Sequence, residues 1–118
     1  MRPYERFAAW MHCHELTLAV YHASTDWPPA ERFGLTAQVR RAAFSAAANI
    51  AEGSAKRGTR EFRRFLDISL GSLAEITYAL RLARDLQYLS PEAWTALDDL
   101  ATTASKTTWG LYRRTARF

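Results

Sequence analysis

At 118 residues the chain is long enough for one domain, and dividing it would leave each half with too little core to fold. Apolar side chains make up 48% of the sequence, including four Trp, six Phe and five Tyr, which excludes wholesale disorder. The formal net charge is +4, the single cysteine excludes an intrachain disulfide, and no apolar run approaches the roughly 20 residues that span a bilayer. We therefore expect one cytoplasmic domain covering residues 1–118, with no membrane partner.

The first predicted helix extends from about Phe7 to about Ser24. Within it, apolar side chains recur at mixed three- and four-residue spacings, as they do on a helix with one buried stripe. Pro28 and Pro29 follow this segment, and each disfavours helix at the residue before it. The first helix therefore ends before these prolines.

The second predicted helix begins near Leu35 or Thr36 and extends to about Ser54. Its buried seam alternates four- and three-residue steps through Leu35, Val39, Ala42, Ala46, Asn49 and Gly53. Small residues dominate this seam, so a neighbouring helix can approach it closely.

The third predicted helix is the longest, from about Arg60 to about Tyr88, after a break at residues 53–58. Thr59 is the expected N-cap, and Glu61 in the first turn suits the positive end of the helix dipole. The apolar face of this helix is too wide for a single seam. We predict that it touches two neighbours within one bundle; the alternative is that part of it packs on another subunit.

The fourth predicted helix starts with a clear signal, because Ser90 suits the N-cap, Pro91 the first helical position and Glu92 the first turn. Its apolar residues continue at three- and four-residue steps to Leu111, before a basic tail at residues 113–118. Four helices joined by short loops predict an all-α fold, an antiparallel up-down-up-down four-helix bundle.

Signals for catalysis or metal binding are weak. No Glu has a His three positions later, as a di-iron bundle needs, and neither a nucleophile turn nor a glycine-rich phosphate loop occurs. His12, Cys13 and His14 do not share a helix face, so we interpret them as surface histidines beside a partly buried thiol. Arg6 and His12 loosely resemble the motif of some helical RNA-cleaving domains, which we interpret as chance. We expect no enzyme activity, no cofactor and no metal.

Basic residues concentrate where the third helix begins. A basic cluster between residues 56 and 64 consists of Lys56, Arg57, Arg60, Arg63 and Arg64. Glu61 is the one acid in this stretch, and five minus one equals the +4 of the whole chain, so the rest is neutral overall. Three of the arginines share a helix face near exposed backbone amides, which suits phosphate. The cluster is either a phosphate-binding surface or a solvated face, and Arg40, Arg41 and the tail arginines add to it or form another.

Stretches between residues 10 and 90 carry a resemblance to a known family. The fullest are Glu-Arg-Phe-Gly-Leu-Thr-Ala-Gln-Val-Arg-Arg-Ala-Ala at 31–43, Asn-Ile-Ala-Glu-Gly at 49–53 and Leu-Gly-Ser-Leu-Ala-Glu at 70–75. Residues 10–21, 27–28, 61–62, 65–66 and 83–86 continue the series in order. In these stretches the sequence resembles the four-helix bundle proteins encoded in intervening sequences of bacterial 23S ribosomal RNA genes. The fourth helix matches only in kind.

The resemblance implies an assembly and partners that the residues alone do not indicate. Proteins of this family, and the similar accessory proteins of diversity-generating retroelements, form ring-like homopentamers with a basic surface. The retroelement members partner a reverse transcriptase and contact nucleic acid, and members are not known as enzymes. The resemblance therefore implies a homopentamer, with RNA or DNA and a reverse transcriptase as candidate partners.

The family motif also implies a structural polar layer. Carried over position by position, its residues are Arg40, Arg41, Asn49, Glu52, Gly53, Ser72 and Glu75. We expect the Asn, the Ser and the two Glu to meet between the second and third helices with an Arg as charge partner, since burying unpaired carboxylates costs roughly several kcal/mol. Phe44 and the alanines at 46–48 depart from the family pattern, which weakens any site on that strip but not the fold.

Two classes of function remain. We predict a non-enzymatic, oligomeric binding protein that contacts nucleic acid or serves a reverse transcriptase through the basic cluster. The alternative is a protein–protein scaffold with no nucleic-acid role, which would use the wide apolar face and three aromatic residues expected at the surface: Trp27, Trp109 and Tyr112. Salt separates the two, because it weakens phosphate contacts much more than hydrophobic association.

Overall fold

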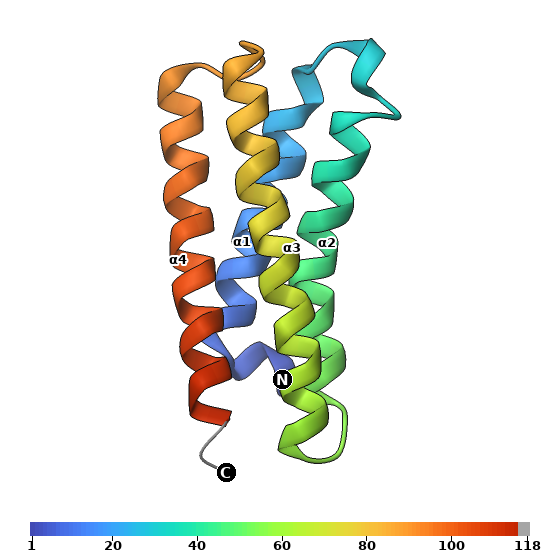
Figure 1. Cartoon of the computed structure of the whole chain (residues 1–118), viewed down its shortest axis with the longest axis vertical. Helices are drawn as coiled ribbons and strands as arrows, with labels where there is room; N and C mark the ends of the chain where they lie inside the picture. The colour runs from blue at the N-terminus through green and yellow to red at the C-terminus, as the bar shows by residue number, and fades with distance from the viewer. Residues whose placement is uncertain (116–118) are drawn as a thin grey trace.

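The computed structural model describes residues 1–115 and confirms the all-α prediction (Figure 1). Its four long helices are α1 (Ala8–Ala23), α2 (Leu35–Ser54), α3 (Thr59–Asp85) and α4 (Pro91–Thr115). Short 3-10 turns precede and follow α1: η1 (Pro3–Arg6), η2 (Ser24–Asp26) and η3 (Pro29–Glu31). The bundle is elongated, with extents of 45 × 24 × 24 Å.

Consecutive helices run in opposite directions and pack side by side, and α4 closes the ring by packing on α1 (Figure 1). The wide apolar face of α3 contacts both α2 and α4, as predicted.

The bundle has two different ends. We call the end formed by residues 1–7, 53–60 and 111–115 the turn end, at the bottom of Figure 1, and the end formed by residues 24–35 and 85–91 the proline end.

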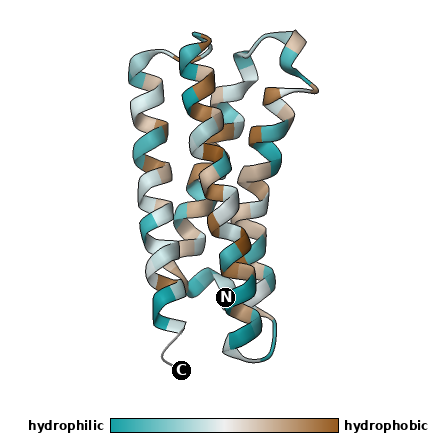
Figure 2. Ribbon diagram, in the orientation of Figure 1, coloured by the Kyte–Doolittle hydropathy of each residue, from teal (hydrophilic) through white to brown (hydrophobic). Residues whose placement is uncertain are grey.

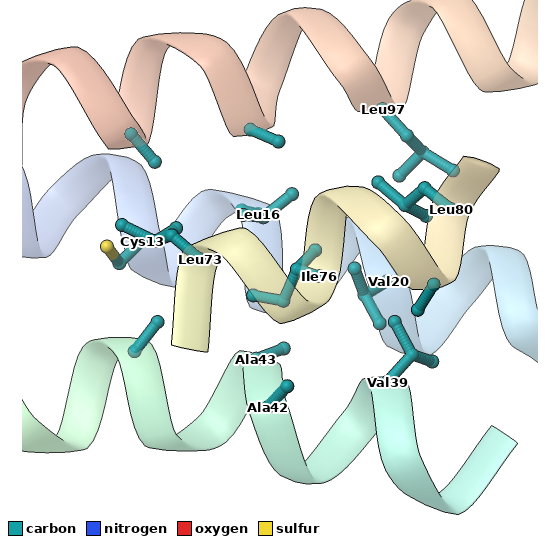
Figure 3. Packing of buried hydrophobic residues seen from close by; sticks show 14 of the residues in the cluster. Cys13, Leu16, Val20, Val39, Ala42, Ala43, Leu73, Ile76, Leu80 and Leu97 are labelled. Carbon is teal, nitrogen blue, oxygen red and sulfur yellow. The ribbon is translucent and has the colours of Figure 1, made fainter. Parts of the chain in front are cut away.

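The core is one continuous cluster along the bundle axis. In its middle, Leu16 and Val20 of α1 and Ile76 of α3 face the small residues Ala42 and Ala43 of α2 (Figure 3). Hydrophobic and hydrophilic residues alternate along each ribbon, as expected for helices with one buried face (Figure 2). None of the helices in residues 1–115 combines the length and the hydropathy that crossing a lipid bilayer requires.

Small residues on α2 let α3 approach closely, as the seam predicts. A Cβ atom added to the buried Gly53 would lie 2.7 Å from the Cβ of Phe65 and 3.0 Å from the Cδ1 of Phe62. Only a residue without a side chain fits at this contact. The glycine therefore sets the distance between the two helices at the turn end.

The predicted helix boundaries hold to within a few residues, with two corrections. The start of α4 is confirmed, since the Ala93 N–H donates to the Ser90 hydroxyl at 3.1 Å. The prediction of Thr59 as the N-cap of α3 is wrong: Thr59 is the first helical residue, and Gly58 precedes it with φ of 83°. A glycine takes this position because the left-handed region strains other residues.

The C-terminus of α3 lies at Asp85, before the predicted Tyr88. Gln87 has φ of 65°, the Tyr88 N–H donates to the Ala83 carbonyl at 2.8 Å, and the Gln87 N–H donates to the Arg84 carbonyl at 2.9 Å. These two bonds form a Schellman motif, in which a left-handed residue ends the helix. Sequence reasoning missed it because glycine usually occupies that position.

Candidate nucleic-acid interface

The basic cluster lies at the turn end of the bundle. Lys56 and Arg57 belong to the turn after α2, and Arg60 to the first turn of α3. All three are exposed, and none forms an ion pair within residues 1–115. Their charges therefore face solvent without a neutralising partner in the described chain.

The other two members of the cluster are engaged in local contacts. The Arg63 guanidinium lies 4.3 Å from the centroid of the Tyr112 ring of α4, and its Nε is buried without a hydrogen-bond partner among residues 1–115. Arg64 forms an ion pair with Glu61 at 3.3 Å and lies 4.7 Å from the Phe65 ring centroid. Arg63 thus helps to hold α3 against α4. Lys56 lies 5.7 Å from the Phe65 ring centroid but forms no ion pair, so Lys56, Arg57 and Arg60 are the free part of the cluster, defined as its cations without an ion pair in the described chain.

A pocket of about 460 Å³ opens at the same end. Its cations come from three segments that are distant in sequence: Arg6 of η1, Lys56 of the turn and Arg114 of α4. None of the lining side chains in the described chain is acidic. Arg114, one of the tail arginines, thus adds to the basic cluster, which is one of the two predicted alternatives. Arg117 lies outside the described residues.

The predicted polar layer forms only in part. Asn49 donates to the Ser45 carbonyl at 2.8 Å, and the hydroxyls of Ser45 and Ser72 share a hydrogen bond of 2.8 Å between α2 and α3. Glu52 and Glu75 are exposed instead, so their predicted burial is wrong for the single chain. Both carboxylates keep their hydration, because they lie outside the packed contact of α2 with α3.

The expected arginine partners of that layer lie elsewhere. Arg40 donates to the Ser24 hydroxyl at 2.8 Å and to the Tyr21 carbonyl at 3.1 Å, which fastens α2 to the end of α1. Arg41 is exposed. Neither arginine pairs with a carboxylate in residues 1–115, and neither adds to the basic cluster at the turn end.

Sequence comparison identifies the family. The model of the 23S rRNA-intervening sequence protein family matches residues 5–110. The chain belongs to this family. The match extends beyond the resemblance at residues 10–90 and includes most of α4, so all four helices follow the family pattern.

A solved structure supports the same fold. The chain is similar to a protein of unknown function from the S23 ribosomal protein family of Bacteroides thetaiotaomicron, determined at 1.70 Å resolution. The two share 20% sequence identity with a TM-score of 0.79, over 89% of this chain and 98% of the other. No curated protein matches the sequence.

Within this member of the family, small hydroxyls take the role that the carboxylates were expected to fill. The Ser69 hydroxyl donates to the Ala46 carbonyl at 2.7 Å, and the Thr17 hydroxyl donates to the Ala43 carbonyl at 3.0 Å. Each bond ties a neighbouring helix to the backbone of α2. Alanines in the α2 seam expose these carbonyls to the neighbouring helices, a consequence of small residues that sequence reasoning overlooked.

His12, Cys13 and His14 point in different directions, as their spacing predicts. His12 Nδ1 lies 3.2 Å from the Thr107 hydroxyl of α4, and the His14 ring stacks on Trp10 at 4.9 Å. Cys13 is fully buried, and this burial raises the pKa of its thiol to about 11. No three His, Cys, Asp or Glu side chains in residues 1–115 gather as metal ligands would.

An apolar groove bears on the scaffold alternative. It lies between α1 and α2, has a volume of about 600 Å³, and includes the exposed side chains Leu18, Tyr21 and Phe44. Trp109 is also half-exposed and stacks on Tyr112 at 5.5 Å. The third aromatic residue expected at the surface, Trp27, is buried, because it packs against Tyr88 at 6.0 Å.

The proline end is tied together by Glu31. Its carboxylate accepts hydrogen bonds from the Leu35 N–H at 3.0 Å and from the Tyr88 hydroxyl at 2.8 Å. Both hydrogen bonds lower the pKa of Glu31 below its ordinary value, and the Leu35 bond has the larger effect. Donating its hydroxyl proton to this carboxylate raises the pKa of Tyr88, because deprotonation would break the bond and place two negative charges side by side. The acid thus links η3 to α2 and to the segment after α3.

Proposed function

We propose that the protein is a non-enzymatic, oligomeric nucleic-acid-binding protein that contacts phosphates with the turn end. The observation that carries this proposal is the set of unpaired cations there. Lys56, Arg57 and Arg60 are exposed without ion pairs in the described chain, and Arg6 and Arg114 reach the same end from other segments. Exposed cations of one sign attract the phosphate backbone without reading its sequence.

The distribution of charge, rather than the net charge of the chain, favours a phosphate-binding surface over a face that is only hydrated. A soluble surface needs mixed charges, yet the lining of the pocket at the turn end contains no acid within residues 1–115. Glu61 is the acid nearest in sequence, and its partner is Arg64. The rim of the pocket therefore carries an excess of positive charge, while Arg60 lines a neighbouring hollow together with Glu61 and Asp67.

We further propose, from the family resemblance, that the chain assembles as a homopentamer and that a reverse transcriptase is a candidate protein partner. A ring would present the basic cluster five times. Several weak phosphate contacts on one strand would then add up by multivalency. The phenyl rings nearest to Lys56, those of Phe62 and Phe65, are half-buried or buried, so they offer no open platform on which successive bases could stack. Binding of internal nucleotides should therefore follow charge and shape rather than base sequence.

The scaffold alternative is favoured by one observation. Leu18 is 59% exposed and Phe44 is 64% exposed, side by side on the groove between α1 and α2. An apolar surface of this kind serves association with protein rather than with phosphate. A scaffold without a nucleic-acid role would depend on this groove and would ignore the charges at the turn end.

Fluorescence anisotropy of a structured RNA and a DNA duplex across a salt series tests the proposal. Wild-type protein should bind both, with affinity falling linearly in log salt at about 0.9 per neutralised phosphate on duplex DNA. The triple variant Lys56→Ala, Arg57→Ala and Arg60→Ala should bind more weakly, with a slope shallower by about 2 to 3.

A control variant separates local from global charge. Arg32→Ala, Arg41→Ala and Lys106→Ala remove the same three charges from exposed positions outside the turn end. This control should retain a slope close to that of the wild type. Equal slopes for the two triple variants would reject the turn end as the interface. Absence of binding at low salt would reject a nucleic-acid role and favour the scaffold.

A further inference from the structure

The pocket at the turn end joins an apolar wall to a cationic rim. Its wall includes the half-buried Phe7 and Phe62 and the buried Leu111. The two phenyl rings lie 5.5 Å apart between centroids, inclined at 51°. Two aromatic rings, one from Phe7 directly after η1 and one from Phe62 of α3, thus line the same pocket as the exposed cations.

The rim is built from side chains that have no acidic partner in the described chain. Arg6, Lys56 and Arg114 are all exposed. The Arg6 guanidinium lies 5.4 Å from the centroid of Phe7, so the cation and the apolar wall are adjacent. A ligand that matches both parts carries an anionic group at one end and a flat apolar body at the other.

Simple ligands satisfy only half of this arrangement. Inorganic phosphate would leave the phenyl rings uncovered, and an uncharged nucleoside would leave the guanidinium groups without an anion. A volume of about 460 Å³ lies within the usual size of a small-molecule site, roughly 300 to 1,000 Å³. It suits one nucleotide unit rather than a base-paired duplex.

We infer that this pocket binds a single nucleotide carrying a phosphomonoester, with the phosphate on Arg6 and Arg114 and the base against Phe7 and Phe62. The inference rests on the proposed function and deepens it. The exposed cations would contact internal phosphates of a strand, and the pocket would hold one terminal nucleotide of that strand. The same chemistry has two sources, a free nucleoside monophosphate or the 5′-phosphorylated end of a strand. Arginines suit a doubly charged phosphate through paired N–H donors.

Calorimetric titration with adenosine monophosphate, beside adenosine, tests the site itself. The monophosphate should bind at least about tenfold more tightly than adenosine, because charge-assisted hydrogen bonds to the phosphate are lost in the nucleoside. The variant Arg6→Ala and Arg114→Ala should lose about tenfold in affinity for the monophosphate. The control Arg32→Ala and Lys106→Ala removes two exposed charges outside the turn end and should change it by less than about fivefold.

Anisotropy of a short single strand with either a 5′-phosphate or a 5′-hydroxyl distinguishes the two sources. The phosphorylated strand end would be the ligand if the phosphorylated strand binds more tightly, if the Arg6 and Arg114 variant loses this preference, and if the monophosphate displaces the strand. Monophosphate binding with no preference between the strands would assign the free nucleotide.

The inference is overturned if the monophosphate does not bind, binds no better than adenosine, or binds the Arg6 and Arg114 variant as tightly as wild type. Salt-dependent duplex binding in that case would leave the proposed function standing. Monophosphate binding without any binding of duplex or structured RNA would reject the proposed function and keep the pocket. Both arginines are exposed, and circular dichroism of the variants verifies that the fold is intact.

Discussion

The two ends of this bundle use charged residues in opposite ways. At the proline end, Glu31 accepts bonds from Leu35 and Tyr88, and Arg84 pairs with Asp85 at 3.2 Å. At the turn end, Arg64 pairs with Glu61, but five exposed cations have no ion pair in the described chain and a pocket opens among them: Arg6, Lys56, Arg57, Arg60 and Arg114. The contacts of Glu31 hold elements of the bundle together, whereas the unpaired cations of the turn end create a positive field that an external anion can neutralise.

The comparison shows how a small helical fold can separate stability from binding. Buried Trp27 and the Glu31 bonds hold the proline end together without needing a partner. At the turn end the stabilising contact is steric instead, the close approach at Gly53. Changes at the proline end should therefore affect unfolding, and exposed charges at the turn end should affect binding.

The largest effect on stability is expected at the Gly53 contact. Gly53→Ala would place a Cβ atom 2.7 Å from the Cβ of Phe65, so α2 and α3 must move apart. Overpacking of this kind should lower the free energy of unfolding by about 2 kcal/mol. Urea unfolding at a fixed protein concentration measures it.

Gly71 provides the matched control, since a Cβ atom there would meet nothing within 4 Å and the residue lies in the middle of α3. Gly71→Ala should raise stability by about 1 kcal/mol through helix propensity alone. Equal effects of the two substitutions would contradict the close approach at the turn end.

A smaller effect is expected from the residue that ends α3 at the proline end. Gln87 has φ of 65°, a conformation that costs a non-glycine residue about 1 kcal/mol, so Gln87→Gly should stabilise the protein by about that amount. Gly58→Ala at the turn end should have the opposite sign, because Gly58 has φ of 83°. Thermal unfolding compares the two; a stabilising Gly58→Ala would be incompatible with the observed turn.

The smallest effect concerns pH. The pKa of Glu31 is lowered on folding, so its carboxylate contributes stability above the ordinary value of about 4.3, and this contribution is lost as pH falls through the lowered pKa. Glu31→Gln should lower the melting temperature at neutral pH, and the difference from wild type should shrink in acid. Tyr88→Phe removes one of the two bonds and should give an intermediate result. A difference independent of pH would show that the carboxylate's charge is not involved.

Much of the fold follows from local signals in the sequence. Prolines at 28 and 29, the Ser90-Pro91 start and the small α2 seam place the four helices to within a few residues. These features act through neighbours in the chain or through one helix face, so periodicity detects them. Gln87 escaped this reasoning because a left-handed residue without a glycine carries no sequence signal.

The candidate site could be predicted only in part. Lys56, Arg57 and Arg60 are close in sequence, so a charge count finds them. Arg6 and Arg114 join them only because the ends of α1 and α4 meet the α2–α3 turn, which depends on the ring order of the helices. The predicted burial of two carboxylates failed for a related reason: which residues of α2 and α3 face each other depends on how the two helices are aligned, and periodicity within one helix does not give that alignment.

Hydrogen–deuterium exchange on adding a DNA duplex tests most directly whether the turn end is the interface. The method reports on each segment whatever the size of the assembly. Exchange should slow at residues 1–7 and 53–64 and remain unchanged at residues 24–35 of the proline end. Protection confined to the α1–α2 groove or to the proline end, with residues 53–64 unaffected, would contradict the division of roles between the two ends.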